Sequence, residues 1–199
     1  MKTFAAQALV VAGFVTLGGS AQAGCAPSPD GVGSVCGPQV VDTASMPALP
    51  NGLWQIMTDT SPMDDSKSVF ATLPSKTMID GRYGGAPAPA KIVMRCMEHS
   101  TNVLFMVNDH FLADVQGYGR VEYRIDDKKA AHVNAEESTD NMALGLWSGK
   151  RAIPFIKSLF GGERLTVRIT PYNESPYTME FDIRNTEAAA QDLRAACGW

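Results

Sequence analysis

The sequence predicts a mainly β protein, an antiparallel two-sheet sandwich with two accessory α-helices and disulfide bonds. Three observations lead to this prediction. Short segments with the composition and alternation of strands follow one another from residue 53 onward, turn-forming residues separate them, and only two segments have a helical pattern. Two packed antiparallel sheets accommodate such a series of short strands. The expected strands are 53–58, 68–73, 91–97, 102–107, 120–125, 142–147, 165–170 and 177–183.

Composition limits the class and size of the protein. The chain has 199 residues, of which 45% are hydrophobic and 19% charged, enough for one compact domain with a small appendage. This balance excludes a disordered chain, and no apolar run reaches the roughly 18 residues that a membrane helix needs. The net charge is −4 and no basic cluster stands out, so we expect no nucleic-acid partner. With three histidines and no CxxC pair, we expect no cofactor and no metal.

The N-terminus has the pattern of a secretory signal peptide over residues 1–23. A basic start is followed by an apolar core over residues 4–17 and by a small-x-small ending at Ala23, which is typical of a signal peptidase site. A membrane anchor is the alternative, but the apolar stretch is short. Cys25 would allow lipidation, yet Gln22 occupies the position where a lipoprotein signal has an aliphatic residue. We therefore expect a soluble, periplasmic mature chain without a transmembrane span.

The mature chain is expected to begin with an arm and to continue as one domain. Prolines interrupt every helix or central strand that could form in residues 24–51, which we interpret as a Pro/Gly-rich arm. Residues 52–199 form the β domain. Its strands alternate as half-buried strands do, so that Val121 points to one side and Arg124 to the other. The Pro/Gly/Ala stretch 81–89 is expected to be the longest inner loop.

Two segments of the β domain have helical patterns. Residues 148–160 place apolar side chains along one stripe, with Ser148 able to cap the helix and two glycines able to end it. Pro154 lies in the first turns, so the regular helix is expected to begin there. Residues 186–197 are rich in Ala, Gln and Leu, and Cys197 lies on their apolar face.

All four cysteines lie in the exported part of the chain. An even number in an oxidising compartment indicates two disulfides. Three pairings are possible. We favour Cys25–Cys36, which closes the short loop of the arm, together with Cys96–Cys197, which ties the middle of the domain to its last helix.

Motifs for nucleophilic catalysis are missing from the sequence. It has neither GxSxG nor SxxK, and its histidines lie in separate segments. His110 follows Asp109, but neighbouring strand residues point to opposite faces, so we interpret His110 as a surface or turn residue. Carboxylates are numerous, and a paired-carboxylate hydrolase would bring two of them within about 5 to 10 Å around a cleft. Aspartate is also the usual turn residue, which is the simpler interpretation. The tryptophans would form a sugar platform or, more often, fill a core.

A series of short motifs runs along the β domain in a characteristic order. They are GLWQI (52–56), SPMDDSKSV (61–69), MRC (94–96), TNV (101–103), YRID (123–126), STD (138–140), RITPY (168–172), SP (175–176) and LRAACGW (193–199). Their order resembles the VasI/TagO family of type VI secretion-associated proteins, over residues 52 to 199. The resemblance implies an exported accessory of the secretion apparatus without an established enzymatic role, and it supports the pairing of Cys96 with Cys197.

We hypothesise a polar patch at one end of a sheet, where arginines and aspartates bind a protein partner. An internal salt-bridge network that locks strand ends is the alternative. The residues of this predicted patch are Asp64, Asp65, Arg124, Asp126, Asp140 and Arg168.

The sequence thus predicts an exported, non-enzymatic envelope accessory that binds a protein of the envelope or of the secretion apparatus. A periplasmic inhibitor or immunity-type module against an envelope hydrolase is the first alternative, and it would present a protruding loop such as residues 81–89. A carboxylate-dependent cell-wall hydrolase is the second, and it requires two opposed acids in a deep cleft.

Overall fold

A computed structural model describes residues 25–27, 34–36, 53–63 and 65–199. The chain divides into two units, Met1–Pro47 and Ala48–Trp199, and each is described by itself. In the first unit, strands β1 (Cys25–Pro27) and β2 (Ser34–Cys36) pair antiparallel with Cys25 and Cys36 in register. The side chains of these strands, the expected signal peptide and most of the expected arm lie outside the described part. The Cys25–Cys36 disulfide therefore stays a prediction.

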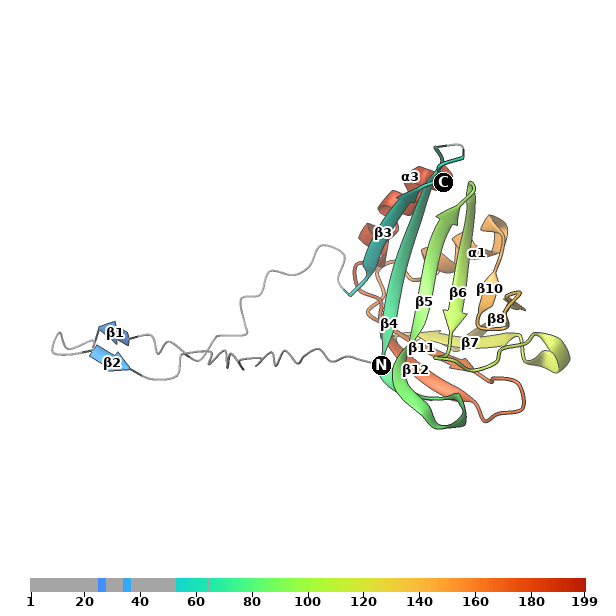
Figure 1. The fold of residues 1–199 in the computed structure, drawn as a ribbon, viewed down its shortest axis with the longest axis horizontal. Coiled ribbons are helices and arrows are strands. Elements are labelled where there is room, and N and C mark those ends of the chain that lie inside the picture. The colour runs from blue at the N-terminus through green and yellow to red at the C-terminus, as the bar shows by residue number, and fades with distance from the viewer. Residues whose placement is uncertain (1–24, 28–33, 37–52, 64) are drawn as a thin grey trace, which may run out of the picture. The chain divides into compact units, whose positions relative to one another are not determined.

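The second unit contains two antiparallel sheets, which confirms the predicted architecture (Figure 1). The larger sheet has six strands in the order β3-β4-β5-β6-β10-β9, and its first four strands form successive hairpins. These strands are β3 (Gln55–Thr60), β4 (Lys67–Gly81), β5 (Gly85–Met97), β6 (Ser100–Met106), β9 (Glu136–Glu137) and β10 (Leu144–Leu146).

The smaller sheet has four strands in the order β12-β11-β7-β8. In Figure 1, β7 runs across the picture whereas β4, β5 and β6 run along it, so the strands of the two sheets cross. Side chains alternate as predicted, with Val121 buried and Arg124 exposed. The strands of this sheet are β7 (Arg120–Ile125), β8 (Ala131–Asn134), β11 (Arg164–Ile169) and β12 (Tyr177–Asp182).

The two sheets approach each other where β4 is irregular. The register between β4 and β5 shifts between Pro74 and Met78. At this irregularity the Thr77 hydroxyl accepts a hydrogen bond from the backbone N–H of Glu180 in β12 at 3.1 Å, and Lys76 forms an ion pair with the Glu180 carboxylate at 3.4 Å. A bulge bends its strand and increases the local twist. The bend therefore lets one long strand contribute to the larger sheet and contact the smaller one.

Three α-helices complete the described part of the domain. Helix α1 (Gly149–Ser158) begins five residues before Pro154, so the prediction that it begins at Pro154 is wrong. The second predicted helix is divided at Ala190 into α2 (Thr186–Ala189) and α3 (Gln191–Cys197). The predicted Cys96–Cys197 disulfide is present and attaches α3 to β5. No helix among the described residues is long and apolar enough to cross a membrane.

The core lies between the two sheets and α1. Phe155 of α1 packs edge-on against Phe105 of β6 and Tyr123 of β7, with ring centroids 5.5 Å and 5.2 Å away. Since β6 and β7 belong to different sheets, this helix side chain joins both. Trp54, one of the candidate platform residues, is buried, and its indole N–H donates to the Thr186 hydroxyl at 3.2 Å.

The expectation of a long loop over residues 81–89 is wrong. Strands β4 and β5 continue to Gly81 and Gly85, and the 3₁₀ turn η2 (Arg82–Gly84) joins them. Within the described residues, β6 pairs with β5 from Lys91 onward, so Pro87 and Pro89 lie in a stretch whose ladder is formed with β4 alone. Proline is tolerated at such an edge because the N–H that it lacks would have pointed away from the partner strand.

Candidate functional site

The end of the β4–β5 hairpin presents an exposed tyrosine. Gly81 and Gly85 face each other so closely that a Cβ on Gly81 would lie 2.6 Å from a backbone carbon of Gly85. Tyr83 follows in the left-handed region, with φ 56°, and Gly84 with φ 80° completes the turn. A non-glycine residue in this region costs free energy. The turn directs the Tyr83 side chain outward, where it is 92% exposed.

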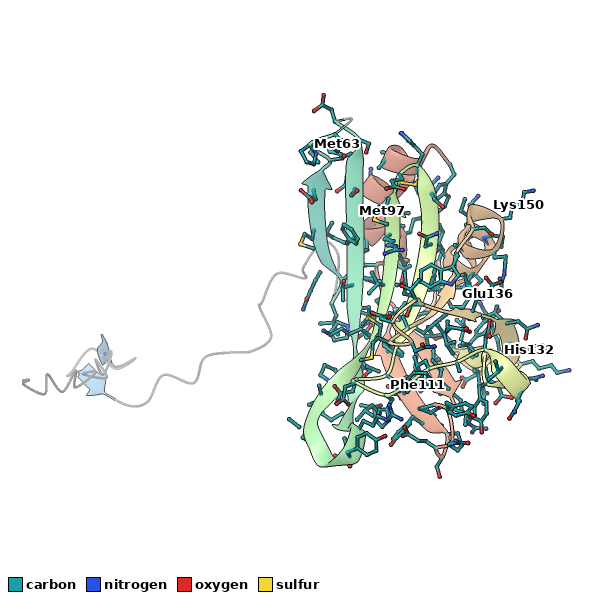
Figure 2. All side chains as sticks on the ribbon, turned by 45° about the vertical axis from the view of Figure 1, so that its right-hand side comes forward. Met63, Met97, Phe111, His132, Glu136 and Lys150 are labelled. Atoms are coloured by element: carbon teal, nitrogen blue, oxygen red, sulfur yellow. A yellow bond between two sulfur atoms is a disulfide. The ribbon has the colours of Figure 1, made fainter. Side chains whose placement is uncertain are left out.

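Aromatic rings from two other segments, the connection between β6 and β7 and that between β11 and β12, gather near Tyr83. The guanidinium of Arg82 lies 4.7 Å from the centroid of the Tyr83 ring and 5.5 Å from that of Phe111, the residue labelled beside the hairpin in Figure 2. Phe111 in turn contacts Tyr172 at 6.2 Å, and Tyr172 contacts Tyr118 at 5.2 Å between centroids. We call Arg82, Tyr83, Phe111, Tyr118 and Tyr172 the aromatic end.

A contact between a buried histidine and a glutamate fixes this arrangement. His110 is 2% exposed, its Nδ1 lies 2.6 Å from Oε2 of Glu174 and its Nε2 lies 2.9 Å from the backbone carbonyl oxygen of Asp80. Glu174 also faces Arg82, with 3.7 Å between Oε1 and Nε. Both ring nitrogens of His110 are thus within hydrogen-bond distance of a partner from another segment. Segments that are far apart in the sequence are therefore held together at this end of the hairpin.

The polar groups around the pair reinforce the hairpin end. Asp109 accepts a hydrogen bond from the backbone N–H of Arg82 at 2.6 Å. Tyr177 packs against the His110 ring at 4.8 Å between centroids, and partial burial, with the charge of Glu174, raises the pKa of its hydroxyl. His110 follows a turn, as predicted, but the interpretation as a surface residue is wrong, because His110 pairs with a carboxylate that the sequence places 64 positions away.

The structure separates the residues of the predicted polar patch. Asp64 lies outside the described residues, and Asp65 lies in the turn between β3 and β4. Arg124 and Arg168 lie on the outward face of the smaller sheet, on β7 and β11. Among the described members of the patch, no hydrogen bond or ion pair joins one to another. The function of these residues stays a prediction.

The two remaining aspartates of the predicted patch stabilise turns. Backbone N–H groups of Arg164 and Glu163 donate to Asp126 at 2.9 Å and 3.1 Å, and these bonds lower the pKa of its carboxyl. The hydroxyl of Ser138 donates to Asp140 at 2.5 Å and lowers the pKa of that carboxyl in the same way. Both are the turn aspartates that the simpler interpretation of the sequence expects.

Two carboxyl groups, Asp114 and Glu137, lie close together on the surface. A hydrogen bond to Glu137 raises the pKa of Asp114, and the same bond lowers the pKa of Glu137. The backbone N–H of Asp114 also donates to Glu137 Oε2 at 2.9 Å. Sequence analysis missed this pair because Asp114 precedes the 3₁₀ turn Val115–Gly117 whereas Glu137 belongs to β9. Both carboxyl groups are open to solvent, and neither lines the pocket described next.

A pocket of about 1050 Å³ lies beside α2. Its buried carboxylate, Asp182, accepts hydrogen bonds from the Arg184 guanidinium, with 2.8 Å between Oδ1 and Nε, and this bond lowers the pKa of Asp182. A carboxylate held as an anion in this way is suited to a structural ion pair and not to donating a proton.

The Asp182–Arg184 pair predicts a defined loss of stability in acid. The pKa of Asp182 is lower in the folded protein than in the unfolded chain, where it is about 3.9. The ion pair therefore contributes to the free energy of unfolding above that unfolded pKa, and this contribution is lost as the pH falls through the folded pKa. Asp182→Asn is expected to lower the free energy of unfolding at pH 7 by about 1–3 kcal/mol, and the deficit should shrink below about pH 4. Urea unfolding at both pH values measures it, with Glu98→Gln in an exposed turn as control. An equal deficit at both pH values would contradict the assignment.

Comparison with known proteins places the chain in a family. The family described as "Type VI secretion system VasI, EvfG, VC_A0118" matches residues 41–199. None of the curated proteins compared with the chain matches it. The chain is also similar to a solved structure, "Crystal structure of invasion associated protein b from bartonella henselae". The two share 15% sequence identity, the match covers 75% of this chain and 96% of that chain, and the TM-score is 0.48. This likeness is too weak to indicate a function. The family match covers the whole of both sheets, so the chain belongs to the VasI family of type VI secretion system proteins.

Proposed function

We propose that the chain is an exported, non-enzymatic accessory of the type VI secretion apparatus that binds a protein partner in the periplasm. The family match supports the association with the apparatus. The N-terminal pattern supports export, and the disulfide between Cys96 and Cys197 suits an oxidising compartment. The observation that carries the binding function is Tyr83, a large aromatic side chain 92% exposed at the end of an ordered hairpin.

The chemistry of the aromatic end is that of a protein interface. Tyrosine and arginine are among the residue types that contribute most to the binding energy of such interfaces, and here Arg82 lies over Tyr83. Neighbouring rings are tilted, by 68° between Phe111 and Tyr172, and so do not offer the flat platform on which a sugar stacks. The tilted rings and the projecting Tyr83 instead fit a partner protein with an apolar pocket.

The aromatic end is also prepared for binding in advance. The His110–Glu174 pair and the hydrogen bond from Arg82 to Asp109 hold its loops in place. The left-handed conformation of Tyr83 is a strained state, and strain of this kind is concentrated at functional sites. A surface that is ordered before it binds pays less conformational entropy on association.

Tyr83→Ala is expected to weaken partner binding by about 2 kcal/mol, or 30-fold, because it removes the projecting anchor. The partner is first identified by photo-crosslinking in the host envelope, with the crosslinking residue at position 83 in one strain and at position 63 in another. Met63 is equally exposed, at 91%, but belongs to the turn between β3 and β4. Figure 2 shows it at the opposite end of the larger sheet from the hairpin.

Binding of the purified partner then gives the affinity. Tyr83→Phe should retain most of the affinity of the parent, because the ring and its contact with Arg82 remain, and Met63→Ala should retain all of it. Equal affinity of the Tyr83→Ala variant and the parent would remove the aromatic end from the proposal. A partner crosslinked from position 63 alone would move the interface to the β3–β4 turn.

An inhibitor or immunity-type module is the second candidate, favoured by the same projecting hairpin. This function requires that Tyr83 enter the active site of an envelope hydrolase. Inhibition of the identified partner's activity, lost with Tyr83→Ala, would distinguish it from a purely assembling role. No comparable observation favours a cell-wall hydrolase, since Asp182 is engaged by Arg184 and neither Asp114 nor Glu137 lines the pocket.

A further inference from the structure

The outward face of the smaller sheet carries a second surface of different chemistry. Strands β7 and β11 are its two central strands, and their alternation directs four arginines outward, with side chains between 47% and 57% exposed. We call these residues, Arg120, Arg124, Arg164 and Arg168, the arginine face. Central strands are hydrogen-bonded on both sides, so the face is presented on a rigid support.

Positive charge exceeds negative charge on the arginine face. Glu122 is shared by Arg120 and Arg168, at 3.4 Å and 3.6 Å. Asp127 is likewise shared by Arg124 and Arg164, at 3.9 Å and 3.4 Å. Four guanidinium groups therefore have two carboxylates between them, although the whole chain has a net charge of −4.

The surroundings of the face do not cancel this excess. At its β12 edge Lys76 pairs with Glu180, which is neutral as a pair. The turn after β7 adds one carboxylate, Asp126, and two exposed lysines, Lys128 and Lys129. The sheet face is thus a local positive field on an acidic protein, which favours an anionic ligand.

Phosphate is the anionic group that fits this face best. A guanidinium binds phosphate through two parallel hydrogen bonds, and neighbouring arginines on two strands can bind several phosphates of one surface. A protein interface would be expected to include an apolar or aromatic anchor. Among the described residues, the large exposed apolar side chains are Leu53, Met57, Met63, Met78, Tyr83 and Val115, none of which lies on the strands of this sheet.

We propose that the arginine face docks the protein on the phosphate groups of an anionic membrane surface. Such docking needs no inserted apolar side chain, and each arginine near the surface contributes roughly five-fold to binding. It also leaves the aromatic end, which contains none of these arginines, available to a protein partner. This proposal does not depend on the identity of that partner.

Vesicle co-sedimentation tests the proposal with the full chain as recovered from its host. The vesicles contain equal parts of phosphatidylglycerol and phosphatidylcholine, or phosphatidylcholine alone. Arg124→Gln with Arg168→Gln is expected to reduce binding to the anionic vesicles roughly 25-fold. The matched control, Lys91→Gln with Lys150→Gln, removes the same charge from β5 and from α1, where Figure 2 labels Lys150, and should bind like the parent.

Three results would support the docking surface together: preference for anionic vesicles, loss of binding at high ionic strength, and recovery by Arg124→Lys with Arg168→Lys. Circular dichroism and thermal unfolding show whether each variant is folded. Equal binding of the parent to both kinds of vesicle, or an equal loss in the lysine control, would overturn the proposal. Binding to a glutamate-rich peptide without binding to anionic vesicles would also overturn it and assign the face to an acidic protein.

Discussion

Removing the Cys96–Cys197 disulfide, by Cys96→Ala with Cys197→Ala, is expected to lower the free energy of unfolding by about 4–5 kcal/mol. The bond closes a loop with a sequence separation of 101 residues, and cross-linking so long a loop greatly restricts the unfolded chain. The melting temperature should fall by about 10–15 °C for a domain of this size. Urea denaturation monitored by tryptophan fluorescence measures the change, with the midpoint expected about 2 M lower.

The folded structure should persist in the variant because other contacts hold α3 against the larger sheet. The indole N–H of Trp199 donates to the Thr101 hydroxyl at 2.9 Å, and Leu193 is fully buried. The far-UV circular dichroism of the variant should therefore match that of the parent. The parent with the Cys96–Cys197 disulfide reduced provides the control and should be no more stable than the double variant. An unchanged midpoint would show that the bond does not constrain the unfolded chain as expected.

The strands of the domain were accessible from sequence because burial imposes a two-residue period. Val121 and Arg124 follow this period, and their exposure in the structure agrees with it. Strands β8 and β9 were missed because each is short. β8 has four residues at the sheet edge and none of them is fully buried, so no two-residue alternation of apolar and polar side chains can be recognised in it. The end of the β4–β5 hairpin was missed for a different reason. Prolines in a sequence indicate a loop, and they fit a strand only where one of its two edges has no partner strand, which the sequence does not show.

The candidate site could not be assembled from sequence because its contacts join distant segments. Arg82, Phe111 and Tyr172 come from the hairpin end and two loops, and the register of the sheets brings them together. His110 and Glu174 carry no local pattern that would indicate their pairing. The available signal was the single tyrosine among glycines at Tyr83, because an aromatic residue in a turn has no core to fill.

The charged residues show the same limit. Arg124 and Arg168 lie on the outward face of their strands, but the aspartates expected beside them are engaged elsewhere. Asp126 binds backbone N–H groups, and Asp127 provides the shared carboxylate instead. Alternation along a strand gives the face on which a side chain lies, whereas the choice of ion-pair partner depends on turn geometry that one residue can change.

Phe155→Ala is expected to destabilise the domain by about 3–5 kcal/mol, because it opens a cavity at the point where α1 joins both sheets. Phe155 is 4% exposed, and its ring packs against Phe105 of one sheet and Tyr123 of the other. The surrounding strands are fixed by their hydrogen-bonded ladders and cannot close around the missing ring. Both edge-on aromatic contacts, each worth about 0.5–1.5 kcal/mol beyond burial, are lost together.

Two further variants separate the cavity from an effect on the helix. Phe155→Leu retains most of the volume and should cost less than about half as much as the alanine variant. Lys150→Ala changes an exposed position of α1 and should leave the unfolding midpoint within about 0.5 kcal/mol of the parent. If Phe155→Ala were no more destabilising than Lys150→Ala, the two sheets would have to be held together without this helix, and α1 would then be an accessory to the fold instead of part of its core.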